Sequence, residues 1–246
     1  MARYERLSKV CARISKSAEE SDVHNILSDI CLYYGVDHAT FLHEAGVGVP
    51  ISFVSTYPES WCERYRRENY LHIDPTIKLM TSGLLPADWD ALSEDSKAEK
   101  DFFQDALCFG IGAHGMSIPT RGPFGQRGLF TVASALPLDE WQNLKLSIIY
   151  DVHILALYLH DRMFRLKLGG RKSAPHSLSR REKECLELLA YGKIPKQISA
   201  TLNISESAVR HCLQSARHKM KATTTYKALA QAVALGLIDV QTPDRS

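Results

Sequence analysis

The segment LGGRKSAPHS at residues 168–177 constrains the fold most, because it divides the chain into two parts of opposite charge. It combines paired glycines, a proline, small polar residues and basic side chains, which is typical of a linker. Residues 1–160 hold 14 basic and 21 acidic side chains, a net charge of −7, whereas residues 175–246 hold 11 basic and six acidic ones, a net charge of +5. Such an asymmetry points to a polyanionic partner. The sequence therefore predicts two domains, residues 1–167 and 178–246.

Helical and strand patterns alternate before the linker, which predicts an α+β domain. Four segments rich in β-branched and aromatic residues predict strands, and we expect an antiparallel sheet with helices on both faces, an α/β/α sandwich. The last helix, Leu138 to about Arg165, carries apolar residues at 144, 148, 152, 155 and 159, a stripe suited to self-association. The expected strands are 36–44, 51–57, 115–122 and 127–136, and the other expected helices are 5–15, 22–35 closed by Gly35, 60–68, and one capped by Ser93 that reaches Cys108.

Several classes of protein are disfavoured by the sequence. The N-terminal residues lack the apolar core of a secretory signal, and the most apolar stretch contains Asp151 and His153, so no membrane span is expected. The six cysteines form no C-x-x-C pair and no zinc-binding spacing with histidine, so we expect free thiols and no metal. The expected location is cytoplasmic, without membrane association.

After the linker only helical signals remain, and local motifs fix their ends. Ser179 and Glu182 have the spacing of a capping box, and Gly192 ends the helix that follows. Asn203-Ile204-Ser205 is a tight turn, and Ser205 can cap the next helix. The sequence predicts an all-α domain of four helices at 179–191, 194–202, 206–220 and 225–236.

The third of these helices has two distinct faces. Val209, Leu213, Ala216 and Met220 form one apolar stripe, while basic and amide side chains lie away from it. A short helix, a three-residue turn and a helix with a basic face form the helix-turn-helix layout, which binds double-stranded DNA. The other interpretation is an ordinary three-helix module with a solvated basic face. We assign Arg210 and Gln214 to base edges, and Lys193, Arg217 and Lys219 to phosphates.

The C-terminal residues closely resemble the DNA-binding domain of LuxR-type regulators over about 65 residues. Three positions depart from the family pattern: Ala208 replaces the usual Thr, Cys212 replaces the usual His, and Pro195 occupies a helix that usually lacks proline. The first two changes remove side chains that can donate to phosphate. The residues that match in order and spacing are Glu182, Leu186, Gly192, Lys193, Ile198, Ser205, Val209 and Lys219.

The N-terminal part resembles the autoinducer-binding domain of the same family, which senses acyl-homoserine lactones. The strict part of the match is W-x3-Y-x8-DP-x13-W, formed by Trp61, Tyr65, Asp74 with Pro75, and Trp89. Gly115 and Thr131 match more loosely, and Tyr57 at the start of the same segment is grouped with the ligand-binding residues. The resemblance implies a quorum-sensing regulator that needs no cofactor besides the lactone.

Roles for these residues follow from the resemblance and from the polar atoms of the ligand. Trp61 would donate to the lactone carbonyl, Asp74 would accept from the amide N–H, and Tyr65 would donate to the amide carbonyl. Trp89 would cover the lactone ring, and Thr131 would add a hydroxyl near the acyl carbonyl. Each polar atom left unpaired in a dry pocket would cost about 1–3 kcal/mol.

Each site residue also has a plain structural interpretation. Trp61 and Trp89 suit a core, Tyr65 suits a half-exposed helix position, and Asp74 before Pro75 suits a helix cap. The joint spacing nevertheless favours a pocket.

Strand alternation would place the bulky side chains of Leu42 and Phe53 in the expected pocket. We therefore expect a short, branched or aryl acyl group rather than a long straight chain.

The resulting hypothesis is a homodimeric transcriptional regulator that binds an inverted-repeat promoter site. RNA polymerase is a candidate further partner. Ala228, Leu229, Ala232 and Val233 offer a second stripe for self-association. One alternative is an orphan regulator that binds another small molecule or acts without one. A lactone or amide hydrolase is the other alternative, and it is disfavoured because no nucleophile elbow and no metal-binding histidine run is present.

Overall fold

The computed structural model describes residues 2–44, 50–92, 96–122, 125–169, 178–234 and 236–238. The chain forms two compact units. The first unit ends at Leu166, and the main segment of the second unit begins at Lys167. Helix α6 continues to Gly169, so the first two residues of the predicted linker are helical, and the rest of the linker lies outside the described residues. The domain bounds given above therefore stay a prediction.

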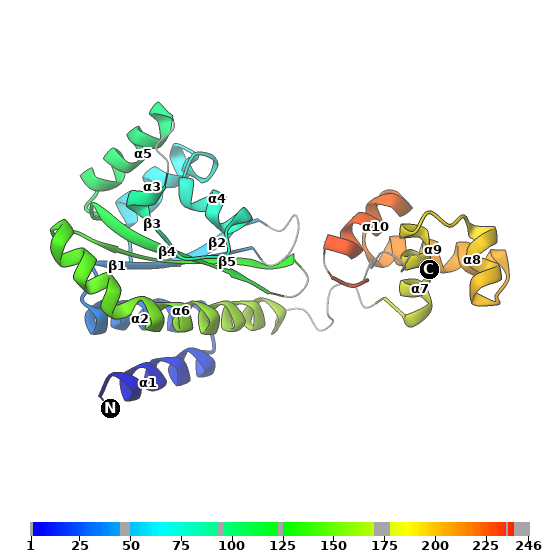
Figure 1. Ribbon diagram of the computed structural model, residues 1–246, viewed down its shortest axis with the longest axis horizontal. Coiled ribbons are helices and arrows are strands. Elements are labelled where there is room, and N and C mark those ends of the chain that lie inside the picture. The colour runs from blue at the N-terminus through cyan, green and yellow to red at the C-terminus, as the bar shows by residue number, and fades with distance from the viewer. Residues whose placement is uncertain are drawn as a thin grey trace. The chain divides into compact units, whose positions relative to one another are not determined.

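The N-terminal unit is a three-layer sandwich of helices and one sheet. Helices α3, α4 and α5 cover one face of the sheet, and α2 and α6 cover the other, with α1 outside them (Figure 1). Its elements are α1 (Ala2–Lys16), α2 (Glu20–Tyr34), β1 (His38–Glu44), β2 (Ser52–Ser55), α3 (Glu59–Arg67), η1 (Tyr70–His72), α4 (Pro75–Ser82), β3 (Ala87–Asp88), η2 (Trp89–Ala91), α5 (Lys97–Cys108), β4 (His114–Arg121), β5 (Arg127–Ser134) and α6 (Leu138–Gly169).

The sheet has five strands in the order β2-β1-β5-β4-β3, and every neighbouring pair is antiparallel. This confirms the predicted α/β/α sandwich, although the two-residue strand β3 was too short to be predicted. Gly35 ends α2 with a φ of 69°, the left-handed conformation that favours glycine. Helix α5 begins at Lys97, where Ser96 and Glu99 form a capping box, and the predicted cap Ser93 lies outside the described residues.

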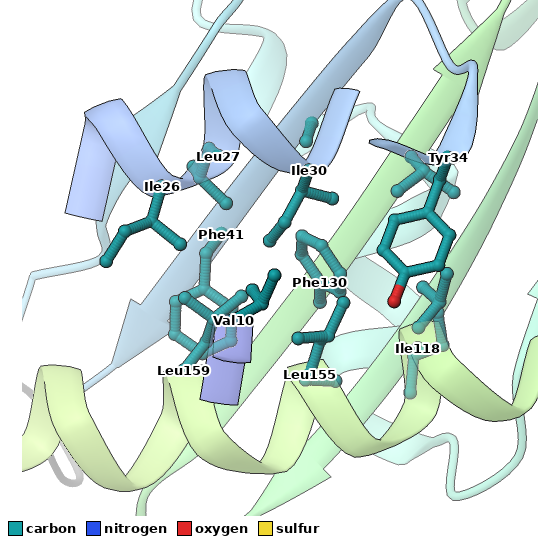
Figure 2. Packing of buried hydrophobic residues seen from close by; sticks show 14 of the residues in the cluster. Val10, Ile26, Leu27, Ile30, Tyr34, Phe41, Ile118, Phe130, Leu155 and Leu159 are labelled. Carbon is teal, nitrogen blue, oxygen red and sulfur yellow. The ribbon is translucent and has the colours of Figure 1, made fainter. Parts of the chain in front are cut away.

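Strand alternation separates two environments. In β1, Ala39 and Phe41 point towards α2 and α6 and join the main core, which Figure 2 shows with Phe41 and Phe130 packed between those helices. Thr40 and Leu42 lie on the opposite face and line a cavity beneath α3. The sheet therefore uses one face for stability and leaves the other for a site.

The apolar stripe predicted for self-association on α6 is instead part of the core. Ile148, Val152, Leu155 and Leu159 are buried against the sheet, and Leu144 packs beside them, so this stripe is not available to a second copy. A different set of apolar side chains on the same helix is exposed: Leu146, Tyr150, Ile154, Leu157 and Tyr158. None of the described helices is long and apolar enough to cross a membrane.

The C-terminal unit consists of helices, as predicted, and the observed ends differ from the predicted ones by at most two residues. The turn before the third helix works because Asn203 adopts a left-handed conformation with a φ of 52°. The stripe predicted on the last helix is mostly internal, since Ala228 and Ala232 are buried and only Val233 is exposed. The helices are α7 (Arg180–Ala190), α8 (Pro195–Leu202), α9 (Glu206–Lys219) and α10 (Thr225–Ala234).

A buried carboxylate joins two helices of this unit. Glu182 completes the capping box of α7 by accepting a hydrogen bond from the backbone N–H of Ser179 at 2.6 Å. It also accepts hydrogen bonds from Ser215 Oγ at 2.7 Å and from Lys219 Nζ at 2.8 Å, both on α9. Burial raises the pKa of Glu182, but the Lys219, Ser215 and Ser179 bonds outweigh it and lower the pKa to about 2.

We expect the ionised Glu182 carboxylate to stabilise the C-terminal unit at pH 7. Because its folded pKa lies below the unfolded value, this contribution is complete above about pH 4.5 and is lost as the pH falls towards 2. The difference between the folded and unfolded pKa values of Glu182 corresponds to ~3 kcal/mol of folding free energy.

Hydrogen exchange of the α7 and α9 amides tests this expectation, with amides of the sheet as the internal control. At pH 7, Glu182→Gln should lower the protection factors of both helices about tenfold to a hundredfold. The loss of protection below pH 4.5 should be present in the wild-type protein and weak in the variant. Equal protection of the two proteins at pH 7 would contradict the assignment.

Candidate ligand-binding site and nucleic-acid interface

A small cavity lies between the free face of the sheet and α3. Its volume is about 40 Å³. Trp61 and Tyr65 are one turn apart on α3, so both side chains reach the same cavity wall. Leu42 and Phe53, which were expected to face the pocket, lie directly opposite each other in the β1–β2 ladder. The lining residues are Thr40, Leu42, Phe53, Tyr57, Trp61, Cys62 and Tyr65.

Asp74 caps helix α4, which is the structural role that its position before Pro75 predicted. Its Oδ1 accepts hydrogen bonds from the backbone N–H of Thr76 at 2.8 Å and from Thr76 Oγ1 at 2.7 Å, and Pro75 occupies the first position of α4. The residue is only 8% exposed. Burial raises the pKa of Asp74 above its ordinary value, although the Thr76 and Tyr65 bonds oppose this shift.

Asp74 does not line the cavity itself, but its second carboxylate oxygen contacts Tyr65, which does. Tyr65 donates its hydroxyl proton to Asp74 Oδ2 at 2.9 Å. A carboxylate oxygen can accept two hydrogen bonds, so Oδ2 keeps one acceptor position whereas Oδ1 is fully used. The phenol has a single proton, so Tyr65 cannot donate to a ligand carbonyl while it donates to Asp74. The carboxylate and the phenol therefore act as one unit.

Two donors in the cavity wall have no hydrogen-bond partner in the part of the chain that the structure describes. These are the indole N–H of Trp61, a residue only 3% exposed, and the hydroxyl of Tyr57. The pKa of Tyr57 is raised above its ordinary value, mainly by burial and secondly by the nearby Asp74 charge. Its phenol therefore keeps its proton. Two donors without a protein partner in the cavity wall, close to the carboxylate that Tyr65 contacts, match a polar ligand.

Trp89, Gly115 and Thr131 form a separate group beside the cavity. Trp89 donates its indole proton to Ser117 Oγ at 3.1 Å, and Ser117 Oγ lies 2.9 Å from Thr131 Oγ1. A Cβ on Gly115 would come within 2.5 Å of the Trp89 ring, so only glycine allows the indole to pack there. Trp61 and Trp89 belong to one apolar cluster, but none of the three predicted residues lines the cavity itself.

Ser117, Thr40 and Cys62 were not predicted as site residues from the sequence. Ser117 and Thr131 face each other in the β4–β5 ladder, so strand alternation from Thr131 could have identified Ser117. Cys62 follows Trp61 directly and lines the cavity, but a buried cysteine has no distinctive sequence signal.

A wider surface depression, about 650 Å³, lies near the end of α2 and contains none of the predicted site residues. It is open to solvent and includes Cys31 and Asp37. No group of three or more His, Cys, Asp or Glu side chains within the described residues is placed to hold a metal ion.

The predicted DNA-reading helix, α9, is capped by Ser205, whose hydroxyl accepts from the backbone N–H of Ala208 at 3.2 Å. Gln214 is exposed, and Arg210 is exposed and paired with Glu206 one turn earlier at 2.6 Å. Such an exposed pair is weak, so Arg210 can exchange Glu206 for another acceptor. The basic face predicted for this helix is therefore free of the core.

The remaining predicted DNA contacts differ in their surroundings. Lys193 donates to Thr201 Oγ1 at 3.1 Å, and Arg217 lies 3.5 Å from the ring of its neighbour His218, so both keep donors for phosphate. Lys219 instead pairs with the buried Glu182, so its predicted phosphate contact must compete with an internal ion pair.

Cys212, one of the departures from the family pattern, packs against the core. Burial and its neighbour Cys212 raise the pKa of the Cys185 thiol to about 12. All six cysteines are free thiols, as expected.

Two family models match the chain. The autoinducer binding domain matches residues 19–163, and the domain described as bacterial regulatory proteins, luxR family, matches residues 176–232. Together they cover both units of the structure.

Similar proteins come from several bacteria. The transcriptional activator protein RaiR of Rhizobium etli is 45% identical over 175 residues, which cover 71% of this chain and 72% of the relative. The transcriptional activator protein LuxR of Aliivibrio fischeri is 25% identical over 238 residues, 94% of each chain.

A crystal structure of Escherichia coli SdiA has the same fold, with a TM-score of 0.74 and 21% identity over 97% of this chain and 99% of that one. A structure of SdiA in complex with octanoyl-rac-glycerol gives a TM-score of 0.75 at 20% identity, over 96% of this chain and 97% of that one. The chain thus belongs to the LuxR family of transcriptional regulators, DNA-binding proteins rather than enzymes, with an autoinducer-binding domain followed by a helix-turn-helix domain.

Proposed function

We propose that this regulator binds an acyl-homoserine lactone between α3 and the sheet, and an inverted-repeat promoter site through α9, as a cytoplasmic homodimer. The observation that supports this ligand is the buried Asp74 carboxylate, which keeps one acceptor position and contacts Tyr65, a neighbour in the cavity wall of Trp61 and its unpaired donor. An acyl-homoserine lactone offers an amide N–H for the first and a lactone carbonyl for the second.

The donor geometry changes one role that the family resemblance implied. Because the Tyr65 proton is held by Asp74, we assign the amide carbonyl to the Tyr57 hydroxyl, which has no other acceptor among the described residues. Trp89 would cover the lactone ring from the neighbouring cluster, held by Ser117 over Gly115. Thr131 would act through its contact with Ser117.

The side chains that line the cavity support a compact acyl group. Leu42 and Phe53 form its lining on the β1–β2 side, and the Arg66 guanidinium lies 5.9 Å from the centre of the Phe53 ring. This contact holds Phe53 at the cavity wall. We therefore propose a short, branched or aryl acyl group, because a long straight chain would have to displace Phe53.

Ligand binding would act on the folded domain by mass action. A lactone that binds only the folded N-terminal domain stabilises it, by about 2.7 kcal/mol at a concentration a hundred times its Kd. More folded domain means more dimer, with the exposed stripe of Leu146, Tyr150, Ile154 and Leu157 on α6 as the proposed contact between copies. A dimer places two copies of α9 on half-sites about one helical turn apart.

Thermal unfolding with a panel of acyl-homoserine lactones tests the ligand proposal. We expect short, branched or aryl lactones to raise the melting temperature of the N-terminal domain by several degrees. Phe53→Ala should shift the strongest response towards longer straight chains, because it removes the bulky side chain at the wall.

Each arm of this experiment can fail separately. A strongest response of the wild-type protein to twelve-carbon chains would contradict the proposed acyl group but not the lactone. No response to any lactone, together with a different molecule found by mass spectrometry in the purified protein, would support an orphan regulator instead.

Arg210→Ala tests the DNA interface. The variant should lose about 1–3 kcal/mol at one base position, because a guanidinium reads guanine through two hydrogen bonds. The measurement is competition binding of single-base variants of a duplex selected from a random pool by the full-length protein. Lys193→Ala, the matched control, should weaken all sequences alike, and unchanged base preference in Arg210→Ala would refute the assignment.

A further inference from the structure

The Glu182 carboxylate connects the start of α7 with the second half of α9. One oxygen accepts from the Ser179 backbone and from Lys219, and the other accepts from Ser215. Glu182 is 4% exposed, so these donors replace the water that a carboxylate would otherwise bind. Removing any donor would leave part of a buried charge unsatisfied.

The two donors from α9 lie on the face of this helix that points towards α7. Ser215 and Lys219 are four residues apart, so they lie one above the other. Arg210 is nine residues before Lys219, which places it about 180° away around the helix at about 100° per residue. Gln214 is about 140° away from Lys219 by the same measure. The Lys219 side chain thus leaves the helix on the side opposite the base-reading residues.

The charge of Lys219 is also largely cancelled where it lies. Its ammonium is 2.8 Å from an ionised carboxylate: the Lys219 side chain is 42% exposed, but the Glu182 side chain is only 6% exposed. Moving the ammonium to a DNA phosphate would leave that carboxylate buried without a cation. Arg217, by contrast, has no carboxylate partner among the described residues and is free to meet a phosphate.

We propose that Glu182 is a positioning residue for DNA recognition, and that Lys219 is its internal counter-ion rather than a phosphate contact. The carboxylate fixes the rotation and tilt of α9 against α7, and so fixes the direction in which Arg210 and Gln214 leave the helix. The DNA-binding charge of α9 comes from its opposite face. This replaces the phosphate role that the sequence predicted for Lys219.

The salt dependence of DNA binding separates a counter-ion from a phosphate contact. Each lost phosphate contact lowers the slope of log K against log salt concentration by about 0.9. With full-length protein and the selected duplex, Lys219→Gln should weaken binding but leave the slope unchanged. Arg217→Gln, the matched control, should lower the slope by about 0.9. A fall of that size in Lys219→Gln would overturn the proposal whatever the control shows.

Base discrimination tests the positioning role. Glu182→Gln should bind operator and single-base variants with affinities that differ less than in the wild-type protein, without a lower salt slope. If Glu182→Gln does not fold, Ser215→Ala removes one of the three contacts and should show the same change more weakly. Full base discrimination in the folded variant would overturn the role of Glu182, because a merely stabilising residue changes the amount of folded protein and not its base preference.

Discussion

The candidate ligand site depends on one buried carboxylate with two connections. Asp74 caps α4 through the Thr76 backbone and hydroxyl, and it receives the Tyr65 proton from α3. These bonds fix two separate helices above the free face of the sheet. They also decide which lone pair remains for a ligand. The same interaction therefore holds the cavity wall together and sets its polarity.

The C-terminal unit uses a buried carboxylate in a related way but with the opposite electrostatic balance. Asp74 accepts hydrogen bonds but has no cationic partner among the described residues, and burial raises its pKa. Glu182 has Lys219 beside it, and its pKa falls to about 2. An acceptor that is incompletely satisfied suits a site that exchanges ligands, whereas a fully neutralised one suits a permanent joint between helices. The two carboxylates thus match the roles proposed for the two domains.

Local signals predicted much of the fold, and long-range contacts account for what they missed. Ser179, Ser205 and Gly192 located helix ends because caps depend on neighbouring residues. The α6 stripe was misread because that helix has two apolar faces, and only packing shows which one the core takes. The sequence spacing identified Trp61, Tyr65 and Asp74 as a group, but the direction of the Tyr65 proton and the Ser117 contact depend on residues 9 and 28 positions away.

The most direct test of the central claim compares an acyl-homoserine lactone with the ester in which oxygen replaces the amide N–H. Calorimetric titration should show that the wild-type protein binds the amide at least about tenfold more tightly, because the ester places an acceptor against the Asp74 carboxylate. Asp74→Asn, which keeps a good helix cap, should bind the amide poorly and lose this discrimination. Equal affinity of the wild-type protein for amide and ester would contradict the proposed role of Asp74.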